Sequence, residues 1–302
     1  MVFINPKTDF AFKKIFGSEQ SHGILISFLN AMLYKGEAIV QDLTILNPYQ
    51  APKLRGVKDT YLDVKALLSS GETVIIEMQV LNVEGFEKRI LYNAAKSYSI
   101  QLNAGEPYSS LNPVIALTIT DFRLFEDIDN PISHFVLKEK EYLVNHPIED
   151  IELVFVELPK FTRTLEELET LTDKWIYFLQ HAPDLRTVPD NMGEVREIQQ
   201  AFEMANQATL TPEELDELEH QIFFIQDQRG AIEKGIKQGI QQGLQQGIQQ
   251  GIQQGLQQGE RQAKLEIAQR MLAMMDDESI AQMTGLSIGD IQQLRQQAQT
   301  PE

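Results

Sequence analysis

Two neighbouring segments in which apolar and polar residues alternate constrain the fold of this chain more than any other feature of its sequence. Residues 60–68 (TYLDVKALL) and 73–80 (TVIIEMQV) have a period of two, which is typical of β-strands with one face on a core. Between them, Ser69, Ser70 and Gly71 suit a three-residue hairpin loop with glycine in the left-handed conformation. The sequence therefore predicts an antiparallel hairpin.

The predicted hairpin places carboxylates inside otherwise apolar strands. Counting back from the loop sets Asp63 opposite Glu77. The same register sets Tyr61 opposite Gln79. Two facing carboxylates repel each other unless a cation lies between them, and a divalent metal ion is one such cation. The alternative is an ordinary solvated polar face, and the hairpin alone does not decide between these interpretations.

The segments before the hairpin predict two helices and a strand. Thr8 is expected to cap a helix over residues 9–16, which Gly17 ends. A second helix is expected over residues 21–33, because the apolar residues there follow the spacing of one helix face. A short strand is expected within residues 38–46. These elements lead directly into the hairpin.

The segments after the hairpin complete a predicted α/β sheet. Residues 86–101 have the apolar stripe of a helix. Residues 113–120 (PVIALTIT) are nearly all apolar, as expected of a central strand covered on both faces. Residues 151–158 (IELVFVEL) alternate and predict an edge strand. The expected fold is thus an α/β sheet with the hairpin at its centre.

From residue 165 onward the pattern is helical. Apolar residues from Leu165 to Leu179 form one face, on which Trp175 is expected to belong to the core. Acidic helices are expected around residues 194–206 and 212–227, the second with favourable capping residues at its start. The C-terminal region is therefore predicted to be entirely helical.

Residues 235–262 form a perfect repeat of four residues, each beginning with glycine. The second residue of six successive units is Ile or Leu. In a helix, each four-residue step overshoots a turn by about 40°, because one turn takes 3.6 residues. Helices that pair along this stripe would therefore wind in a right-handed sense. Each glycine costs about 1 kcal/mol relative to Ala, so the alternative, a low-complexity linker, stays open.

The last segment is similar to a helix-turn-helix. Residues 279–294 (SIAQMTGLSIGDIQQL) contain a helix, a Thr-Gly turn and a second helix that starts at serine. The second helix, residues 288–297, has Arg295 as its only cation, beside Asp290. Glutamine side chains can contact adenine, so recognition of a DNA sequence by this helix is the alternative interpretation. The scarcity of positive charge favours a small helical packing module.

Composition and charge indicate where such a chain could act. There is no cysteine, which fits a reducing cytoplasm. The first residues lack the apolar run of a signal peptide, and no segment is long enough to span a membrane. Residues 1–120 contain 11 Lys and Arg and 11 Asp and Glu, so the rest of the chain has the whole net charge of −18. We expect a soluble cytoplasmic protein whose first part can approach phosphate groups.

The spacing of Asp63, Glu77 and Gln79, with an acidic residue on a preceding helix, resembles the PD-(D/E)xK nuclease fold. More closely, residues 5–125 resemble the Rpn family of recombination-promoting nucleases and predicted transposases. Four segments carry the resemblance: residues 5–17 (NPKTDFAFKKIFG), 61–66 (YLDVKA), 74–80 (VIIEMQV) and 88–108 (KRILYNAAKSYSIQLNAGEPY). The resemblance implies a restriction-endonuclease-like core, a mixed sheet flanked by helices, with an all-α C-terminal region.

The resemblance also implies a chemistry. Asp63 and Glu77 would be ligands of Mg²⁺, or of Mn²⁺ in its place, in the hydrolysis of DNA phosphodiester bonds. Gln79 occupies the position of the lysine of the general pattern, where its amide could orient water or a phosphate oxygen. Since Gln79 brings no positive charge, Lys65 and Arg89 are candidates to supply it.

Asp9 fits the acidic residue found on a helix of this fold. Its other interpretation is a first-turn residue that the helix dipole favours.

The predicted organisation has four parts. Residues 1–160 would form the nuclease-like domain, 161–228 an acidic helical region, 229–262 the tetrad-repeat helix or linker, and 263–302 the small helical module. The leading hypothesis is a DNA endonuclease that promotes recombination or acts on mobile or foreign DNA, and that forms a homo-oligomer through its C-terminal helices. The alternative is a catalytically inactive nuclease-like scaffold.

Overall fold

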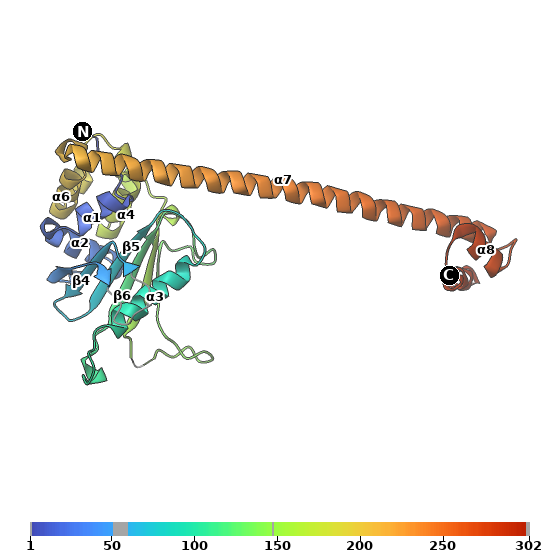
Figure 1. Ribbon diagram of the computed structural model, residues 1–302, viewed down its shortest axis with the longest axis horizontal. Coiled ribbons are helices and arrows are strands. Elements are labelled where there is room, and N and C mark those ends of the chain that lie inside the picture. The colour runs from blue at the N-terminus through green and yellow to red at the C-terminus, as the bar shows by residue number, and fades with distance from the viewer. Residues whose placement is uncertain (1, 51–59, 147, 300–302) are drawn as a thin grey trace. The chain divides into compact units, whose positions relative to one another are not determined.

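The computed structural model describes residues 2–50, 60–146 and 148–299 (Figure 1). The chain divides into two compact units, Met1–Arg229 and Gly230–Glu302. The first unit contains all of the described β-structure, and the second is helical. No helix of the described residues combines the length and the apolar character needed to cross a membrane.

A six-stranded mixed sheet forms the centre of the first unit. Its strand order is β1-β4-β5-β6-β8-β7. The strands are β1 (Leu43–Leu46), β4 (Val64–Leu68), β5 (Thr73–Gln79), β6 (Val114–Thr120), β7 (Ile132–Phe135) and β8 (Ile151–Glu157). The strands β5, β6 and β8 are parallel, while β1 and β4 pair antiparallel at one edge and β7 at the other. The fold class predicted from the sequence is confirmed.

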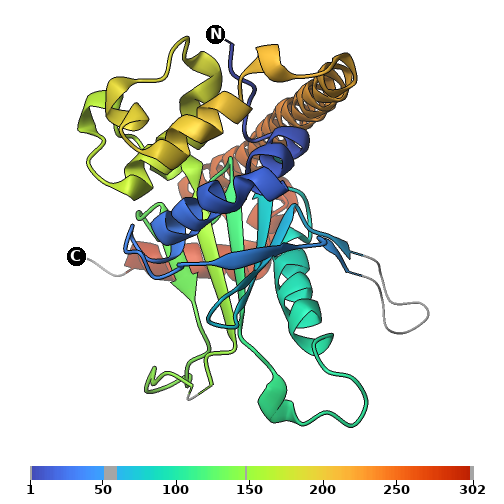
Figure 2. The same cartoon turned by 90° about the vertical axis from the view of Figure 1, so that its left-hand side faces the viewer.

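Helices cover both faces of this sheet (Figures 1 and 2). One face packs against α1 (Asp9–Phe16), α2 (His22–Leu33), α4 (Leu171–His181) and α6 (Arg196–Met204) in the main hydrophobic core. The other face packs against α3 (Phe86–Ser99) in a smaller core. Alternate residues of β5 point into the two cores. The sheet is therefore buried on both sides, as its apolar central strands require.

Short elements connect these helices and strands. The remaining α-helix of the first unit is α5 (Asp190–Gly193). The 3₁₀ turns are η1 (Glu19–Ser21), η2 (Tyr108–Ser110), η3 (Leu158–Lys160), η4 (Leu165–Glu167), η5 (Ala182–Asp184) and η6 (Gln207–Thr209). A second, two-stranded sheet consists of β2 (Tyr49–Gln50) and β3 (Thr60–Tyr61).

The central hairpin has the predicted register between β4 and β5. Val64 pairs with Ile76, and Leu67 pairs with Thr73. At the loop, Gly71 has φ of 108°, the left-handed conformation expected of it. The ladder ends at Val64. The predicted pairing of Asp63 with Glu77, one residue beyond, is therefore not part of it.

Tyr61 does not face Gln79, and this part of the predicted register is wrong. Tyr61 pairs instead with Tyr49 in the two-stranded sheet. Leu62 packs in the core beside α3, whereas Val64 packs in the main core. The chain thus changes direction at Asp63, and residues 60–68 are two short strands rather than one.

The N-terminal helix has the predicted boundaries. The Thr8 hydroxyl oxygen accepts a hydrogen bond from the Ala11 amide, which caps α1. The helix ends at Phe16, and a Cβ atom at Gly17 would lie 2.9 Å from the Lys13 carbonyl oxygen. A glycine is therefore needed there for close packing.

One strand position and two helix starts also differ from the prediction. The strand β8 lies inside the sheet and not at its edge, because it pairs with β6 on one side and with β7 on the other. The helix α4 begins at Leu171, where Thr170 and Asp173 form a capping box, and not at Leu165. The helix α2 begins at His22, after the 3₁₀ turn η1. As predicted, Trp175 is fully buried.

Residues 161–228 contribute to the core of the first unit. Both α4 and α6 pack with α1 and α2, so this segment shares the core of the nuclease-like part of the chain. The division of the chain into four functional parts stays a prediction.

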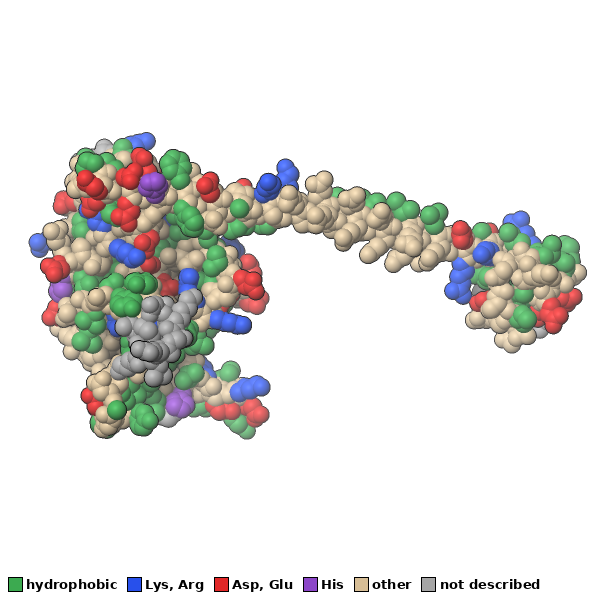
Figure 3. Space-filling view, viewed as in Figure 1, with side chains coloured by type: hydrophobic (Ala, Val, Ile, Leu, Met, Phe, Trp, Pro, Cys, Tyr) green, Lys and Arg blue, Asp and Glu red, His purple; other side chains and the backbone are tan. Residues whose placement is uncertain are grey.

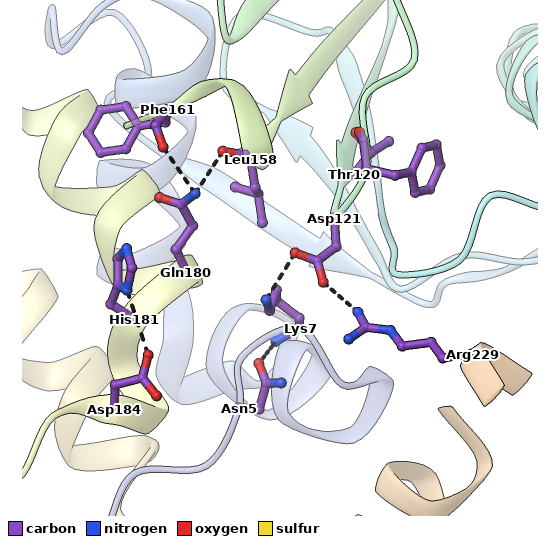
Figure 4. Close-up of polar contacts among 11 residues, drawn as sticks. Asn5, Lys7, Thr120, Asp121, Leu158, Phe161, Gln180, His181, Asp184 and Arg229 are labelled. Carbon is purple, nitrogen blue, oxygen red and sulfur yellow. Dashed lines mark hydrogen bonds and ion pairs between the residues drawn. The ribbon is translucent and has the colours of Figure 1, made fainter. Parts of the chain in front are cut away.

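The long helix α7 (Pro212–Met271) has 60 residues, and its first turns belong to the first unit. There Lys14 Nζ lies 2.6 Å from Glu214 Oε1. Figure 4 shows Asp121 between two cations: Lys7 Nζ lies 2.9 Å from its Oδ1 and Arg229 Nη2 lies 2.7 Å from its Oδ2. Ion pairs thus join the start of α7 to α1 and to the end of β6.

The tetrad repeat is helical throughout and lies within α7. Its six Ile and Leu side chains are between 54% and 66% exposed. Hydrophobic side chains recur along this helix in Figure 3. A Cβ atom built on any of the seven repeat glycines would meet nothing within 4 Å. The fold of the described chain therefore does not itself require glycine at these positions.

The second unit ends in two short helices, α8 (Asp277–Thr284) and α9 (Ile288–Gln299). They pack on the end of α7 through a small core centred on Ala268, Ile280 and Ile291. Gly285, with φ of 71°, makes the turn between them.

Candidate active site

A cavity of about 810 Å³ opens beside the end of β5. It is lined by residues of α1, the segment joining β3 to β4, β5 and α3. Five of the six candidate residues named from the sequence line it: Asp9, Asp63, Glu77, Gln79 and Arg89. The ladder between β4 and β5 ends at Val64, and Asp63, the residue before it, lines the cavity beside the last residues of β5.

Asp63 is held where the ladder ends. Its Oδ2 accepts a hydrogen bond of 2.7 Å from the Met78 amide. This carboxylate thereby replaces the backbone acceptor that a continued strand would have offered to β5. The Asp63 side chain is 18% exposed. The position of Asp63 in the cavity is therefore fixed by its hydrogen bond to β5 at the end of the ladder.

The surroundings of Asp63 favour its protonated form. Burial raises the pKa of Asp63 to about 7, and the hydrogen bond and the charge of the nearby Asp9 carboxyl raise it as well. The Met78 amide and Lys13 act in the opposite direction. Lys13 Nζ lies 2.6 Å from Asp9 Oδ1 and 3.9 Å from Asp63 Oδ1. An additional cation in the cavity would stabilise the ionised carboxylate.

Glu77 is held by two residues of α3. Asn93 Nδ2 donates a hydrogen bond of 2.5 Å to Glu77 Oε1, and Arg89 Nη2 lies 3.7 Å from Glu77 Oε2. Burial raises the pKa of Glu77, while the Asn93 hydrogen bond and the Arg89 charge oppose the rise. The carboxylate is 12% exposed. The site therefore contains two largely buried carboxylates.

Gln79 does not point a free amide into the cavity. Its Oε1 accepts a hydrogen bond of 2.6 Å from Arg89 Nη2, and its Nε2 donates one of 2.6 Å to the Leu81 carbonyl oxygen. The guanidinium carbon of Arg89 also lies 5.4 Å from the Phe86 ring centroid. Gln79 thus positions Arg89, and Arg89 is the cation next to Glu77.

Lys65 lies outside the cavity. It is half-buried in β4, where it pairs with Ile75 and Leu46, and burial lowers the pKa of its amine. Of the two candidates for the missing positive charge, the structure brings Arg89 to the site and leaves Lys65 away from it.

Two site residues, Lys13 and Asn93, were not singled out from the sequence. The spacing of Lys13 from Asp9, four residues along a helix, is a signal that sequence reasoning could have used. Asn93 follows Glu77 by sixteen residues on a different element, and no local spacing links them. Its only signal is an amide on the buried stripe of α3.

The side chains that line the cavity include possible ligands of a metal ion. Within the described residues, no group of three or more His, Cys, Asp or Glu side chains is placed to hold one. Mg²⁺, however, is commonly bound through one or two carboxylates and keeps several waters. Asp63 and Glu77 line one cavity, and carboxylate oxygens are the hard donors that Mg²⁺ prefers, so these two residues fit such a site.

The single cation of α9 is engaged in packing. Arg295 donates hydrogen bonds to Asp277 Oδ1 and to the Leu272 and Met275 carbonyl oxygens. It therefore ties α9 to α8 and to the end of α7.

A mixed sheet that brings Asp63, Glu77 and Gln79 from a hairpin into one cavity, with a flanking helix behind them, has the architecture of the PD-(D/E)xK nuclease fold. The model of the PD-(D/E)XK nuclease family transposases matches residues 6–235, and the chain belongs to this family. The model of the C-terminal HTH domain of the Rpn/YhgA-like nuclease family matches residues 261–296. Comparison with curated proteins and with solved structures gave no match.

These matches confirm the resemblance to the Rpn family. They also assign the helix-turn-helix pattern of α8 and α9 to a recognised domain, where the charge pattern had favoured a packing module. A helix-turn-helix domain suggests contact with DNA.

Proposed function

We propose that this protein is a Mg²⁺-dependent DNA endonuclease that promotes recombination or acts on mobile or foreign DNA. The observation that carries the proposal is the pair of largely buried carboxylates, Asp63 and Glu77, in one cavity of a chain of the nuclease family. Burial is the largest cause of both raised pKa values, so the cavity without metal disfavours the ionised form of each carboxylate. A divalent cation in the cavity would favour the ionised forms.

Each side chain of the site has a defined task in this proposal. Asp63 and Glu77 would hold the metal ion, which when bound makes a water more acidic and neutralises charge on the phosphate. Arg89, fixed by Gln79, can bind a non-bridging phosphate oxygen, which its planar guanidinium suits well. Lys13 pairs with Asp9 and lies near Asp63, so it limits the repulsion between those two carboxyls.

DNA and a second copy of the chain are the proposed partners. The six exposed aliphatic residues of the repeat form a stripe that nothing in the described chain covers. The seven glycines open space along the same helix, although each is about 1 kcal/mol less favourable than Ala in an isolated helix. Glycines that the chain itself does not need are accounted for if another α7 helix packs closely against them.

The test of the nuclease is the digestion of supercoiled plasmid by the full chain in Mg²⁺, in Mn²⁺ and in EDTA. Nicking by the wild type in either metal, absent in EDTA and absent in Asp63→Ala and Glu77→Ala, is the expected result. Equal nicking by wild type and both variants would assign the activity to a contaminant. A folded wild type without activity in either metal would instead favour the inactive scaffold.

A further inference from the structure

Asn93 is a buried residue of α3 that lines the catalytic cavity and is only 2% exposed. Its two polar atoms differ sharply in their surroundings. Nδ2 donates the 2.5 Å hydrogen bond to Glu77 Oε1. Oδ1 is buried and has no hydrogen-bond partner among the described residues.

The orientation of this amide follows from the chemistry of its neighbour. An ionised carboxylate only accepts hydrogen bonds, so the nitrogen of Asn93 must face Glu77. Turning the amide around would place two oxygens against each other. The oxygen of Asn93 is therefore left in the interior, where an unpaired acceptor is unfavourable and rare.

A purely structural asparagine behaves differently. Asn30 of α2 shows the usual pattern, because its Nδ2 donates to the Val40 carbonyl oxygen and its Oδ1 accepts from the Val40 amide. Both ends of that amide stabilise the fold. In Asn93, only the end that holds Glu77 has a partner among the described residues, so what this side chain stabilises is the position of Glu77.

Asn93 also acts together with Arg89. The two residues are four positions apart on α3 and hence lie on the same helix face. Asn93 contacts Glu77 Oε1, while Arg89 approaches Glu77 Oε2. One helix thus holds both oxygens of the carboxylate in a defined orientation.

We propose that Asn93 is a positioning residue that orients Glu77 for metal binding, which rests on the proposed function of Glu77 as a metal ligand. Groups that orient a ligand from behind typically change metal affinity by 10–100-fold when they are removed. Asn93 itself needs no contact with the metal ion or with DNA in this role.

The test compares Asn93→Leu with Ser97→Ala in the full-length protein. Ser97 is buried on the same helix, one turn farther on, and its hydroxyl accepts a hydrogen bond from Gln50, away from the cavity. For each protein, isothermal titration calorimetry gives the dissociation constant of Mn²⁺. Thermal unfolding in EDTA gives the stability without metal.

The two variants should differ in their affinity for Mn²⁺. In Asn93→Leu, Mn²⁺ should bind 10–100-fold more weakly, whatever the change in the unfolding temperature in EDTA. In Ser97→Ala, that temperature should fall and the Mn²⁺ affinity should stay at the wild-type value. Asn93→Ala, which keeps more room in the cavity, should repeat the loss of affinity if Asn93→Leu does not fold.

Three results would overturn the inference. Wild-type Mn²⁺ affinity in both Asn93 variants removes Asn93 from the metal site and leaves the nuclease proposal intact. A loss of stability in EDTA as large as that of Ser97→Ala, with unchanged affinity, makes Asn93 structural. A wild type that binds neither Mn²⁺ nor Mg²⁺ rejects the metal-dependent function and the role of Asn93 with it.

Discussion

Replacing Asp63 by Asn should stabilise the metal-free protein, and more so at high pH than at low pH. The pKa of Asp63 is raised from 3.8 to about 7 in the folded protein, so the folded state prefers the protonated carboxyl. In the unfolded chain the same group ionises near its ordinary pKa. The stabilisation that the folded protein gains from the protonated Asp63 carboxyl is therefore fully present below pH 3.8. It decreases as the pH rises and is lost above about pH 7.

The size of the effect follows from the shift. One pKa unit corresponds to about 1.4 kcal/mol, so the shift to about 7 is worth about 4 kcal/mol above neutral pH. At pH 5.5 the raised pKa of Asp63 lowers the stability of the wild type by only about 2 kcal/mol, by the same relation. Asparagine is neutral at every pH, and its oxygen can still accept the hydrogen bond from the Met78 amide.

The assay is urea unfolding of wild type and Asp63→Asn in EDTA at pH 5.5 and pH 8.5. The variant should be more stable at both values, and the gap should widen by about 2 kcal/mol between them. Asp129→Asn is the control, since Asp129 lies in an exposed loop. A gap that does not change with pH, or a variant less stable than the wild type at pH 8.5, would refute the reasoning. Adding Mg²⁺ should then stabilise the wild type more than the variant.

Three further predictions concern the cation, the repeat and the C-terminal domain. Gln79→Ala should release Arg89 and slow plasmid cleavage by roughly 10²-fold at unchanged stability, as measured by single-turnover kinetics; a wild-type rate would remove Gln79 from the mechanism. A chain ending at Arg229, which keeps the contact with Asp121, should be monomeric by light scattering where the full chain is oligomeric; an unchanged mass would place the contact between copies in the first unit. Arg295→Ala should speed amide hydrogen exchange in α9 without affecting nicking, since about 1–2 kcal/mol of hydrogen bonding is lost there; unchanged exchange would show that the apolar core alone holds α9.

The hairpin shows what sequence reasoning could predict. Alternation and a glycine loop act locally, so they were sufficient for the register of β4 and β5. They could not predict the break at Asp63, because that depends on a non-local pairing of Tyr61 with Tyr49 and on a separate core for Leu62. The prediction failed where the candidate active-site cavity begins.

The missed strand and the late start of α4 have similar causes. The strand β7 has four residues, two of them Ser133 and His134, and it pairs only because β8 offers a free edge. Leu165 has the right spacing for α4, but the capping box of Thr170 and Asp173 starts the helix later. In each case a tertiary partner or a side-chain cap outweighed the apolar pattern.

The candidate site was predictable in its carboxylates but not in its support. Asp63 and Glu77 are visible because charged residues inside apolar strands are unusual. Asn93 and Arg89, the residues that hold Glu77, come from a helix on the second face of the sheet. Their relation to Glu77 depends on how α3 packs, which a single sequence does not show.

The geometry of the repeat limits how copies of the chain can associate. Each four-residue step turns the apolar stripe by about 40°, so it turns by roughly 200° between Ile236 and Leu256. A straight partner helix faces an apolar stripe roughly 100° wide, which is enough for about three of the six aliphatic residues. A long pair of straight helices would therefore leave the other residues in water. Short right-handed crossings, of the kind that glycines four residues apart permit, cover one half of the stripe each. Two such crossings per helix account for all six residues, so assembly through α7 need not stop at two chains.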